Sequence, residues 1–156
     1  MGQFYTESST LIEKLSSIRK NKKIVFTNGC FDLLHIGHVK YLKEAKSKGD
    51  FLIVGINSDA SVRRLKGPTR PIQNESDRSE ILAALEAVDA TVVFTEDTPE
   101  LLIKSLKPDI LVKGGDWKIS QIVGGDFVQS YGGQVLSLMF IDGKSTTNIV
   151  SKIEKS

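Results

Sequence analysis

The sequence predicts an α/β protein, a single domain built on a Rossmann-like, doubly wound parallel sheet. Apolar runs of strand length alternate along the chain with segments whose apolar residues recur at helical spacing. Most of the runs are continuously apolar, which indicates strands covered by helices on both faces, because parallel neighbours need crossover connections. The length of 156 residues suits one domain with its own core.

A helical segment is expected before the first strand. Apolar residues recur at helical spacing from Leu11 to Ile18, and Thr10 with Glu13 has the form of a capping box. A charged stretch then leads into IVFT, Ile24 to Thr27, which is the first predicted strand. We therefore divide the chain into an N-terminal helical segment and a main domain, residues 1–22 and 23–156.

Strands and helices alternate through the rest of the chain. Further strands, rich in β-branched and aromatic residues, are predicted over 51–57, 90–94, 109–113 and 134–140. Helices are predicted over about 37–48, 77–88, 100–106 and 119–131, with a last helix from Ser145. Ligands of such sheets bind beyond the carboxyl ends of the strands. One cleft should therefore be lined by the loops after Thr27, Asn57, Val112 and Phe140.

Composition and charge narrow the function classes. The chain is 40% hydrophobic and 26% charged with a net charge of +2, as in an ordinary soluble globular protein. Its cations are interspersed with acids, so the broad basic surface of a nucleic-acid-binding protein is not expected. The single cysteine, Cys30, suits a reducing compartment, and no apolar run reaches membrane-spanning length. We expect a cytoplasmic protein that has neither nucleic acid nor membrane as a partner.

Both histidines of the chain lie in the loop after the first strand. The sequence TNGCFDLLHIGH leads directly into a helix and places His35 and His38 three residues apart around its N-terminus. Two imidazoles there can point at one anion, and the free backbone N–H groups and the helix dipole add to the attraction. A phosphate group is the expected ligand, and Gly37 leaves room for backbone or nucleotide to approach.

Two other interpretations of the histidines exist. A lone histidine is more often a surface or hydrogen-bonded structural residue, but this pair follows a strand and an Asn-Gly turn where the fold class binds ligands. A metal site is the weaker alternative, because two histidines and a distant aspartate lack the ligand set of a zinc centre. We assign no metal ligand.

Several ordered motifs resemble those of the HxGH nucleotidyltransferases, relatives of the class I aminoacyl-tRNA synthetases that carry HIGH. The motifs are TNGCFDLLHIGHVKYL, the NSD at Asn57 to Asp59, LKGPTRPI, LVKGGDW and the final GKSTT. The resemblance covers nearly the whole chain. Within the family, the motifs are most similar to the adenylyltransferase domain that makes ADP-heptose from heptose 1-phosphate.

The resemblance implies an enzyme that transfers the adenylyl group of ATP to D-glycero-D-manno-heptose 1-phosphate and releases pyrophosphate, feeding lipopolysaccharide or capsule assembly. It implies Mg²⁺ with ATP as substrate, a sugar 1-phosphate as the second substrate, and a homodimer. Such chemistry needs positioning and charge neutralisation more than a nucleophilic side chain. Cys30 is therefore expected to be a small buried residue that fills space.

The resemblance also implies roles for individual residues. His35, His38 and Lys66 would stabilise charge on the phosphates, with Lys66 in a mobile basic loop over 62–71. Arg78 is a further candidate for an anion contact. Asp32 either lies near the second substrate or metal, or caps the turn or the following helix. The nucleotide would be bound by Thr27, Asn28, Gly29, Phe31 and Gly37.

Two later motifs add candidate residues. Gly114 lets the backbone approach a ligand, and Asp116 offers an acceptor for ribose hydroxyls. Lys113 contacts phosphate or ends the strand in solvent, and Trp117 is expected to pack rather than to bind. The final GKSTT lacks the glycine of a P-loop. Its hydroxyls and N–H groups either bind nucleotide phosphate or only cap the last helix, and the resemblance favours both roles, for Ser145, Thr146 and Thr147.

Two alternative functions stay open. The nearest is a cytidylyltransferase that acts on another alcohol phosphate, although Phe140 stands where related glycerol-phosphate cytidylyltransferases carry an arginine. The heptose enzymes usually have an aromatic residue where this chain has Lys144, which is a departure from their pattern. The second alternative is a nucleotide-binding sensor without turnover, which would need no residues to stabilise a transition state.

Overall fold

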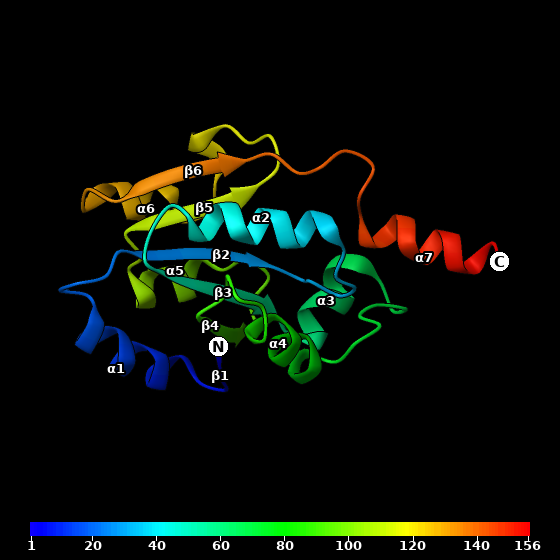
Figure 1. Ribbon diagram of the computed structural model, residues 1–156, viewed down its shortest axis with the longest axis horizontal. Coiled ribbons are helices and arrows are strands. Elements are labelled where there is room, and N and C mark those ends of the chain that lie inside the picture. The colour runs from blue at the N-terminus through cyan, green and yellow to red at the C-terminus, as the bar shows by residue number, and fades with distance from the viewer.

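A six-stranded parallel sheet forms the centre of the computed structural model, which describes residues 1–156 (Figure 1). The strands are β1 Gln3–Tyr5, β2 Ile24–Gly29, β3 Phe51–Asn57, β4 Ala90–Phe94, β5 Ile110–Gly114 and β6 Gln134–Leu138. Their order across the sheet is β1-β4-β3-β2-β5-β6, and every neighbouring pair is parallel. The predicted doubly wound α/β fold is confirmed.

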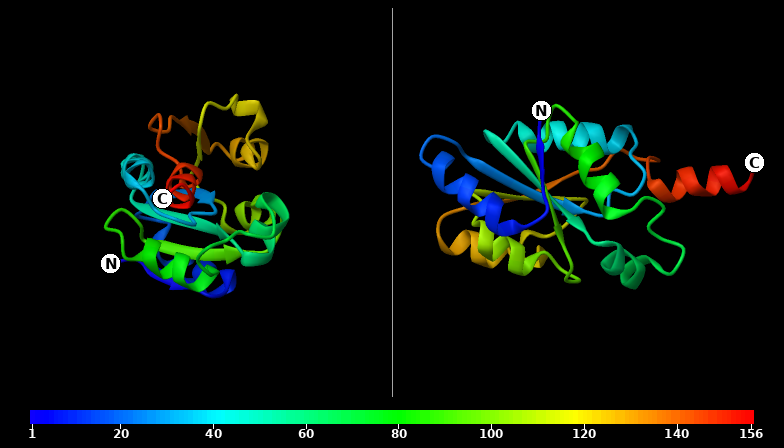
Figure 2. Two further views of the ribbon diagram at one scale, coloured as in Figure 1. Left: turned by 90° about the vertical axis from the view of Figure 1, so that its right-hand side faces the viewer. Right: turned by 90° about the horizontal axis from the view of Figure 1, so that it is seen from below.

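Helices cover both faces of the sheet. They are α1 Ser8–Ile18, α2 Ile36–Lys46, α3 Asp59–Lys66, α4 Glu75–Ala83, α5 Glu100–Leu106, α6 Gly125–Ser130 and α7 Thr146–Glu154. The face with α1, α5 and α6 lies opposite the face with α2 and α4 (Figure 2). α7 extends away from the body of the molecule (Figures 1 and 2). None of the helices has both the length and the apolar character that a membrane crossing requires.

The central strand β2 joins two buried apolar clusters. Successive residues of a strand point to opposite faces. Accordingly, Phe26 belongs to the cluster of Leu11 and Leu15 from α1, whereas Val25 belongs to that of Leu42 from α2. All five side chains are fully buried. The N-terminal segment therefore shares the core of the main domain.

The predicted loop over 62–71 is wrong in its first half, because residues up to Lys66 belong to α3. Ser58 is the N-cap, and its hydroxyl accepts a hydrogen bond from the backbone N–H of Ser61 at 3.1 Å. Asp59 in the first turn and the basic residues in the last turn also suit the helix dipole. The basic stretch is thus carried by a capped helix up to Lys66 and is a loop only beyond it.

The helix predicted over 119–131 is interrupted. A short 3₁₀ turn at Ile119–Gln121 comes first, and α6 begins only at Gly125. Between them, Gly124 has a φ of 81°, a left-handed conformation that glycine adopts readily and that a helix cannot contain. The pair Gly124-Gly125 therefore divides the predicted helix into a 3₁₀ turn and α6.

The start of the chain also differs from the prediction. The capping box at Thr10 is wrong, because α1 already begins at Ser8 with Glu7 as its N-cap and no side-chain cap. β1 was missed because three residues are too few to show a strand period. Its backbone nevertheless pairs with β4 at the edge of the sheet, where Gln3 lies opposite Ala90.

Candidate active site

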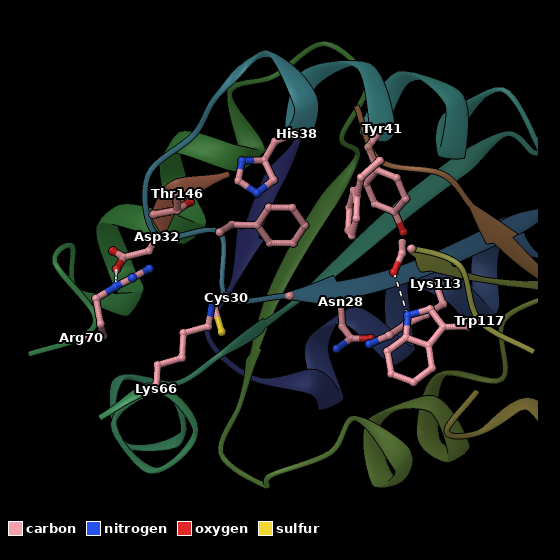
Figure 3. Close-up of a pocket in the computed structure, with 15 residues that line it drawn as sticks. Asn28, Cys30, Asp32, His38, Tyr41, Lys66, Arg70, Lys113, Trp117 and Thr146 are labelled. Carbon is pink, nitrogen blue, oxygen red and sulfur yellow. Dashed lines mark hydrogen bonds and ion pairs between the residues drawn. The ribbon is translucent and has the colours of Figure 1, made fainter. Parts of the chain in front are cut away.

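A cavity of about 370 Å³ opens at the carboxyl ends of β2 and β5, where ligands bind in sheets of this kind (Figure 3). The predicted site residues that line it are Asn28, Gly29, Phe31, Asp32, His38, Lys66, Lys113, Gly114 and Thr146. Other residues also line it, namely Cys30, Tyr41, Arg70, Gly115, Trp117 and Phe140, and Arg70 among them lies in the basic stretch predicted over 62–71.

A second cavity of about 290 Å³ adjoins the first. The two cavities share Asn28, Gly29, Cys30, Lys113 and Trp117. The other walls of the second cavity come mainly from the end of β3, the segment after β4 and the start of the 119–131 region. Two compartments therefore meet at the carboxyl ends of β2 and β5.

The two histidines form a stacked pair at the start of α2. Their ring centroids are 3.8 Å apart, and the ring of Phe31 lies 5.1 Å from that of His38. The Nδ1 of His35, the N-cap, accepts from the backbone N–H of Gly37 at 3.1 Å, and the Nδ1 of His38 accepts from the N–H of His35 at 3.3 Å. Because both Nδ1 atoms are acceptors, each neutral ring carries its hydrogen on Nε2. The pair thus carries two Nε2–H donors, and of the two predicted catalytic histidines only His38 lines the cavity.

Both imidazoles favour the neutral form. Burial, reinforced by the nearby charges of His35 and Lys66, lowers the pKa of His38 from 6.5 to about 4. Burial and the charge of Lys144 also lower the pKa of His35. At neutral pH the histidines therefore act as hydrogen-bond donors, and the fixed positive charge around the cavity comes from lysine and arginine.

Two glycines of the site make room for side chains of the protein itself. A Cβ on Gly37 would lie 2.8 Å from Cε1 and Nδ1 of His35, and a Cβ on Gly114 would lie 2.4 Å from Cζ of Phe140. Gly37 was expected to leave space for backbone or nucleotide, and the structure shows instead that it makes room for the imidazole of His35. Gly37 does not line the cavity, whereas Gly114 does.

Asp32 binds the segment after α3. Its carboxylate accepts from the backbone N–H groups of Ile72 and Gln73, each at 2.9 Å, and from Nε of Arg70 at 2.8 Å. Burial alone would raise the pKa of Asp32, but these hydrogen bonds from Gln73, Ile72 and Arg70 together lower it below its usual value. The ionised carboxylate therefore fixes the segment 70–73, which neither sequence-based interpretation of Asp32 included.

Arg78 lies outside the cavity, which corrects the expectation that it contacts an anion there. Its side chain is fully buried. Its Nη1 donates to the carbonyl of Cys30 at 2.7 Å, its Nη2 to Oδ1 of Asp59 at 2.8 Å, and its Nε to the carbonyl of Gln73 at 3.0 Å. Arg78 thus joins α4, the start of α3 and the loop after β2.

The loop after β5 brings Trp117 rather than Asp116 to the site. Asp116 is exposed and lines neither cavity, whereas Trp117 lines both. The indole N–H donates to the carbonyl of Gly114 at 3.0 Å, and Nζ of Lys113 lies 5.4 Å from the centroid of the ring. Burial lowers the pKa of Lys113. Trp117, which was expected to pack rather than to bind, lines both cavities.

The hydroxyl residues of the final motif have separate positions. Ser145 is the N-cap of α7 and accepts from the N–H of Asn148 at 3.0 Å, which confirms the expected cap. Thr146 lines the cavity and donates from its hydroxyl to the carbonyl of Leu33 at 2.8 Å. Thr147 is exposed and, like Ser145, is not in the cavity wall.

Thr27 lies below the cavity rather than in its wall. It is fully buried within β2, and its hydroxyl shares a hydrogen bond of 2.6 Å with the hydroxyl of Tyr41. Tyr41 comes from α2 and does line the cavity. The pair therefore supports the wall from the side of the sheet.

Comparison with known proteins gives the family. A family model described as cytidylyltransferase-like matches residues 26–149, which include the histidine pair and every residue of the cavity wall. The chain belongs to the cytidylyltransferase-like family. The match ends within α7 and starts within β2, so it covers the sheet apart from β1 and the first residues of β2.

Relatives of this cytidylyltransferase-like chain include two proteins that are both named bifunctional protein HldE. The protein of Geobacter metallireducens is 55% identical over 98% of this chain, and that of Syntrophotalea carbinolica is 60% identical over 86%. The matched regions make up 33% and 28% of those two proteins. The chain therefore spans about a third of the length of these relatives.

Solved structures agree on the fold. The lipopolysaccharide core biosynthesis protein from Thermoplasma volcanium is 29% identical, with a TM-score of 0.62 over 80% of this chain and 100% of the other. The pantoate-beta-alanine ligase from Francisella tularensis is 17% identical, with a TM-score of 0.61 over 100% of this chain and 79% of the other. The second comparison supports the fold alone.

Proposed function

We propose that this cytidylyltransferase-like domain transfers the adenylyl group of ATP to D-glycero-D-manno-heptose 1-phosphate, forming ADP-heptose and pyrophosphate. The observation that carries the proposal is one cavity in which His38 at the start of α2 lies with Lys66, Lys113 and Thr146. The choice of sugar is supported by the motifs that resemble ADP-heptose-forming adenylyltransferases and by 55% identity to a HldE protein. The similarity to a lipopolysaccharide core biosynthesis protein points to the same pathway.

In the proposed reaction, an oxygen of the sugar phosphate attacks the α-phosphorus of ATP. A bond forms between them, the bond from the α-phosphorus to the bridging oxygen breaks, and pyrophosphate leaves with the bonding electrons. Charge that develops on the phosphate oxygens would be stabilised by the Nε2–H groups of His35 and His38 and by the dipole of α2. Lys66 supplies a fixed positive charge, and no covalent intermediate with the protein is required.

The two joined cavities suit a reaction of two substrates. A nucleoside beside Gly114 and Trp117 would place its phosphates near His38 in the first cavity. The second cavity, which reaches the ends of β3 and β4, would hold the sugar. Lys113 borders both compartments. This position suits a contact with the α-phosphate of ATP, which is transferred to the sugar phosphate.

Mg²⁺ is proposed as part of the ATP substrate. No three side chains of His, Cys, Asp or Glu lie together as a metal-ligand set, and the Asp32 carboxylate already binds the segment 70–73. The residues present therefore suit an ion that is held through the triphosphate rather than by the protein. Such an ion would neutralise phosphate charge alongside Lys66.

A homodimer and a cytoplasmic location complete the proposal. α7 has no buried residue, and the exposed apolar side chains of Met139, Phe140 and Ile153 lie on it or on the segment before it. A second copy of the chain would cover this apolar surface. Sedimentation velocity tests the dimer, and a single monomer peak at micromolar concentration would refute it.

The activity is tested by pyrophosphate release with Mg²⁺. ATP and CTP are each combined with heptose 1-phosphate, glycerol 3-phosphate and hexose 1-phosphates. Release only with ATP and heptose 1-phosphate is the expected result. Release only with CTP and another alcohol phosphate would refute the proposed substrates but not the proposed active site. Tight nucleotide binding without pyrophosphate release would indicate a sensor.

A further inference from the structure

Arg70 lies in the wall of the first cavity, between α3 and α4 in the chain. Its side chain is 12% exposed, and its Nε donates to Oδ2 of Asp32, whose side chain is 1% exposed. Its Nη2 is buried and has no hydrogen-bond partner, and it is the only buried side-chain nitrogen or oxygen of the protein in this state. A charged donor therefore lacks an acceptor at the edge of a cavity.

An unpartnered buried donor is costly, because it has lost its water without gaining an acceptor. The guanidinium is charged at every physiological pH and recognises carboxylate or phosphate oxygens with geometric specificity. Asp32 already occupies the Nε of Arg70. An anionic oxygen of a ligand in the cavity would supply the acceptor that Nη2 lacks.

Asp32 holds the guanidinium in position before any ligand arrives. The same carboxylate accepts from the backbone N–H groups of Ile72 and Gln73, so the arginine and the segment that follows it are fixed to one buried group. An arginine that is already oriented loses less side-chain entropy when it binds an anion. The pair is therefore preorganised for binding.

The arrangement of the cavity indicates which phosphate Arg70 meets. Figure 3 shows Arg70 and Lys66 on one side and Lys113 and Trp117 on the other, with His38 between them. If the nucleoside lies beside Trp117 and the α-phosphate near His38, as in the proposed function on which this inference rests, the terminal phosphates extend toward Arg70. We propose that Arg70, positioned by Asp32, binds the β- and γ-phosphates of ATP, the group that leaves as pyrophosphate.

Calorimetric titration with inorganic pyrophosphate tests this proposal on the whole chain. Arg70→Gln removes the guanidinium, and Arg63→Gln is the matched control on an exposed arginine of α3 outside both cavities. We expect Arg70→Gln to weaken pyrophosphate and ATP binding by about tenfold or more. AMP binding should stay within about twofold of the wild type, and Arg63→Gln should change none of the three affinities by more than that.

Arg70→Lys provides a second variant if Arg70→Gln does not fold. It keeps the charge and loses the planar donor geometry, so an intermediate loss of pyrophosphate affinity is expected. The proposal is overturned if the wild type binds no pyrophosphate, if the Arg70 variants bind it as tightly as the wild type, or if the loss falls equally on AMP or on heptose 1-phosphate.

These binding measurements are independent of turnover. A wild-type chain that binds pyrophosphate through Arg70 but forms no ADP-heptose would refute the proposed function and support the role of Arg70 in anion binding. A chain that forms ADP-heptose, with the KM for ATP unchanged in Arg70→Lys and Arg70→Gln, would support the function and refute the role of Arg70.

Discussion

The imidazole ring of His35 stacks on that of His38 with an angle of 28° between the ring planes. Each ring uses its Nδ1 to accept a backbone N–H, so each is held by the first turn of α2 rather than by a distant partner. The orientation of both rings therefore depends on the local backbone. Changes to the site can for this reason be tested with little effect on the core.

His38→Ala should lower turnover by roughly a hundredfold or more, because it removes a donor to charge that develops in the transition state. The measurement is kcat for pyrophosphate release under saturating substrates. Lys40→Ala, on an exposed position of the same helix, is the control and should keep the wild-type rate. An unchanged kcat in His38→Ala would rule out its proposed role.

Stability should fall as the pH is lowered from 6.5 toward 4. In this window the unfolded chain takes up a proton at His38, whereas the folded chain does so only near its lowered pKa of about 4. Since the unfolded state then binds more protons, the free energy of unfolding decreases as the pH falls. Urea unfolding at several pH values measures this, and His38→Gln should show a shallower dependence. Parallel curves for the two proteins would contradict the lowered pKa.

Gly37→Ala should impair the site without unfolding the protein. The new Cβ would lie 2.8 Å from two atoms of the His35 ring, so the ring must move away from its present position. A displacement of about 1 Å can cost on the order of a hundredfold in rate. Ile36→Ala, at an exposed neighbouring position, is the control. A wild-type kcat in Gly37→Ala would show that the position of His35 is not critical.

Arg78→Ala should destabilise the fold. It removes the partner of Asp59 and leaves the carbonyls of Cys30 and Gln73 without their donor, which we expect to cost about 3 kcal/mol in the free energy of unfolding. Urea unfolding measures this change, and Arg63→Ala, on the surface of α3, should change stability by no more than about 0.5 kcal/mol. Equal stability of the two variants would mean that the contacts of Arg78 contribute little.

The strands could be predicted because strands that are buried on both faces have continuously apolar sequences. β3 has the predicted bounds, Phe51–Asn57, and every residue in it is buried. α3 was not predicted because its only buried apolar residue is Val62, so no apolar period marks it. Ser58 could have been recognised as the N-cap of a helix, but the many cations of the segment favoured its interpretation as a loop.

The site was predictable where its residues are close in sequence and much less so where they are distant. Asn28 lies at the carboxyl end of β2 and His38 in the helix that follows, so both could be placed by that end of the strand alone. Arg70 and Arg78, by contrast, are eight residues apart, and only the packing determines that Arg70 lines the cavity while Arg78 is buried against Asp59. Sequence spacing carries no information about that choice.

The strand order also determines when each part of the sheet can form during synthesis. β2 and β3 pair with Ile24 opposite Phe51, so the centre can assemble from a short stretch of chain. Gln3 of β1, however, pairs with Ala90 of β4. At about 5–20 residues per second, the ribosome makes the first of these strands several seconds before its partner. β1 is therefore the earliest of these strands to leave the ribosome, and it must wait for a partner that is made much later.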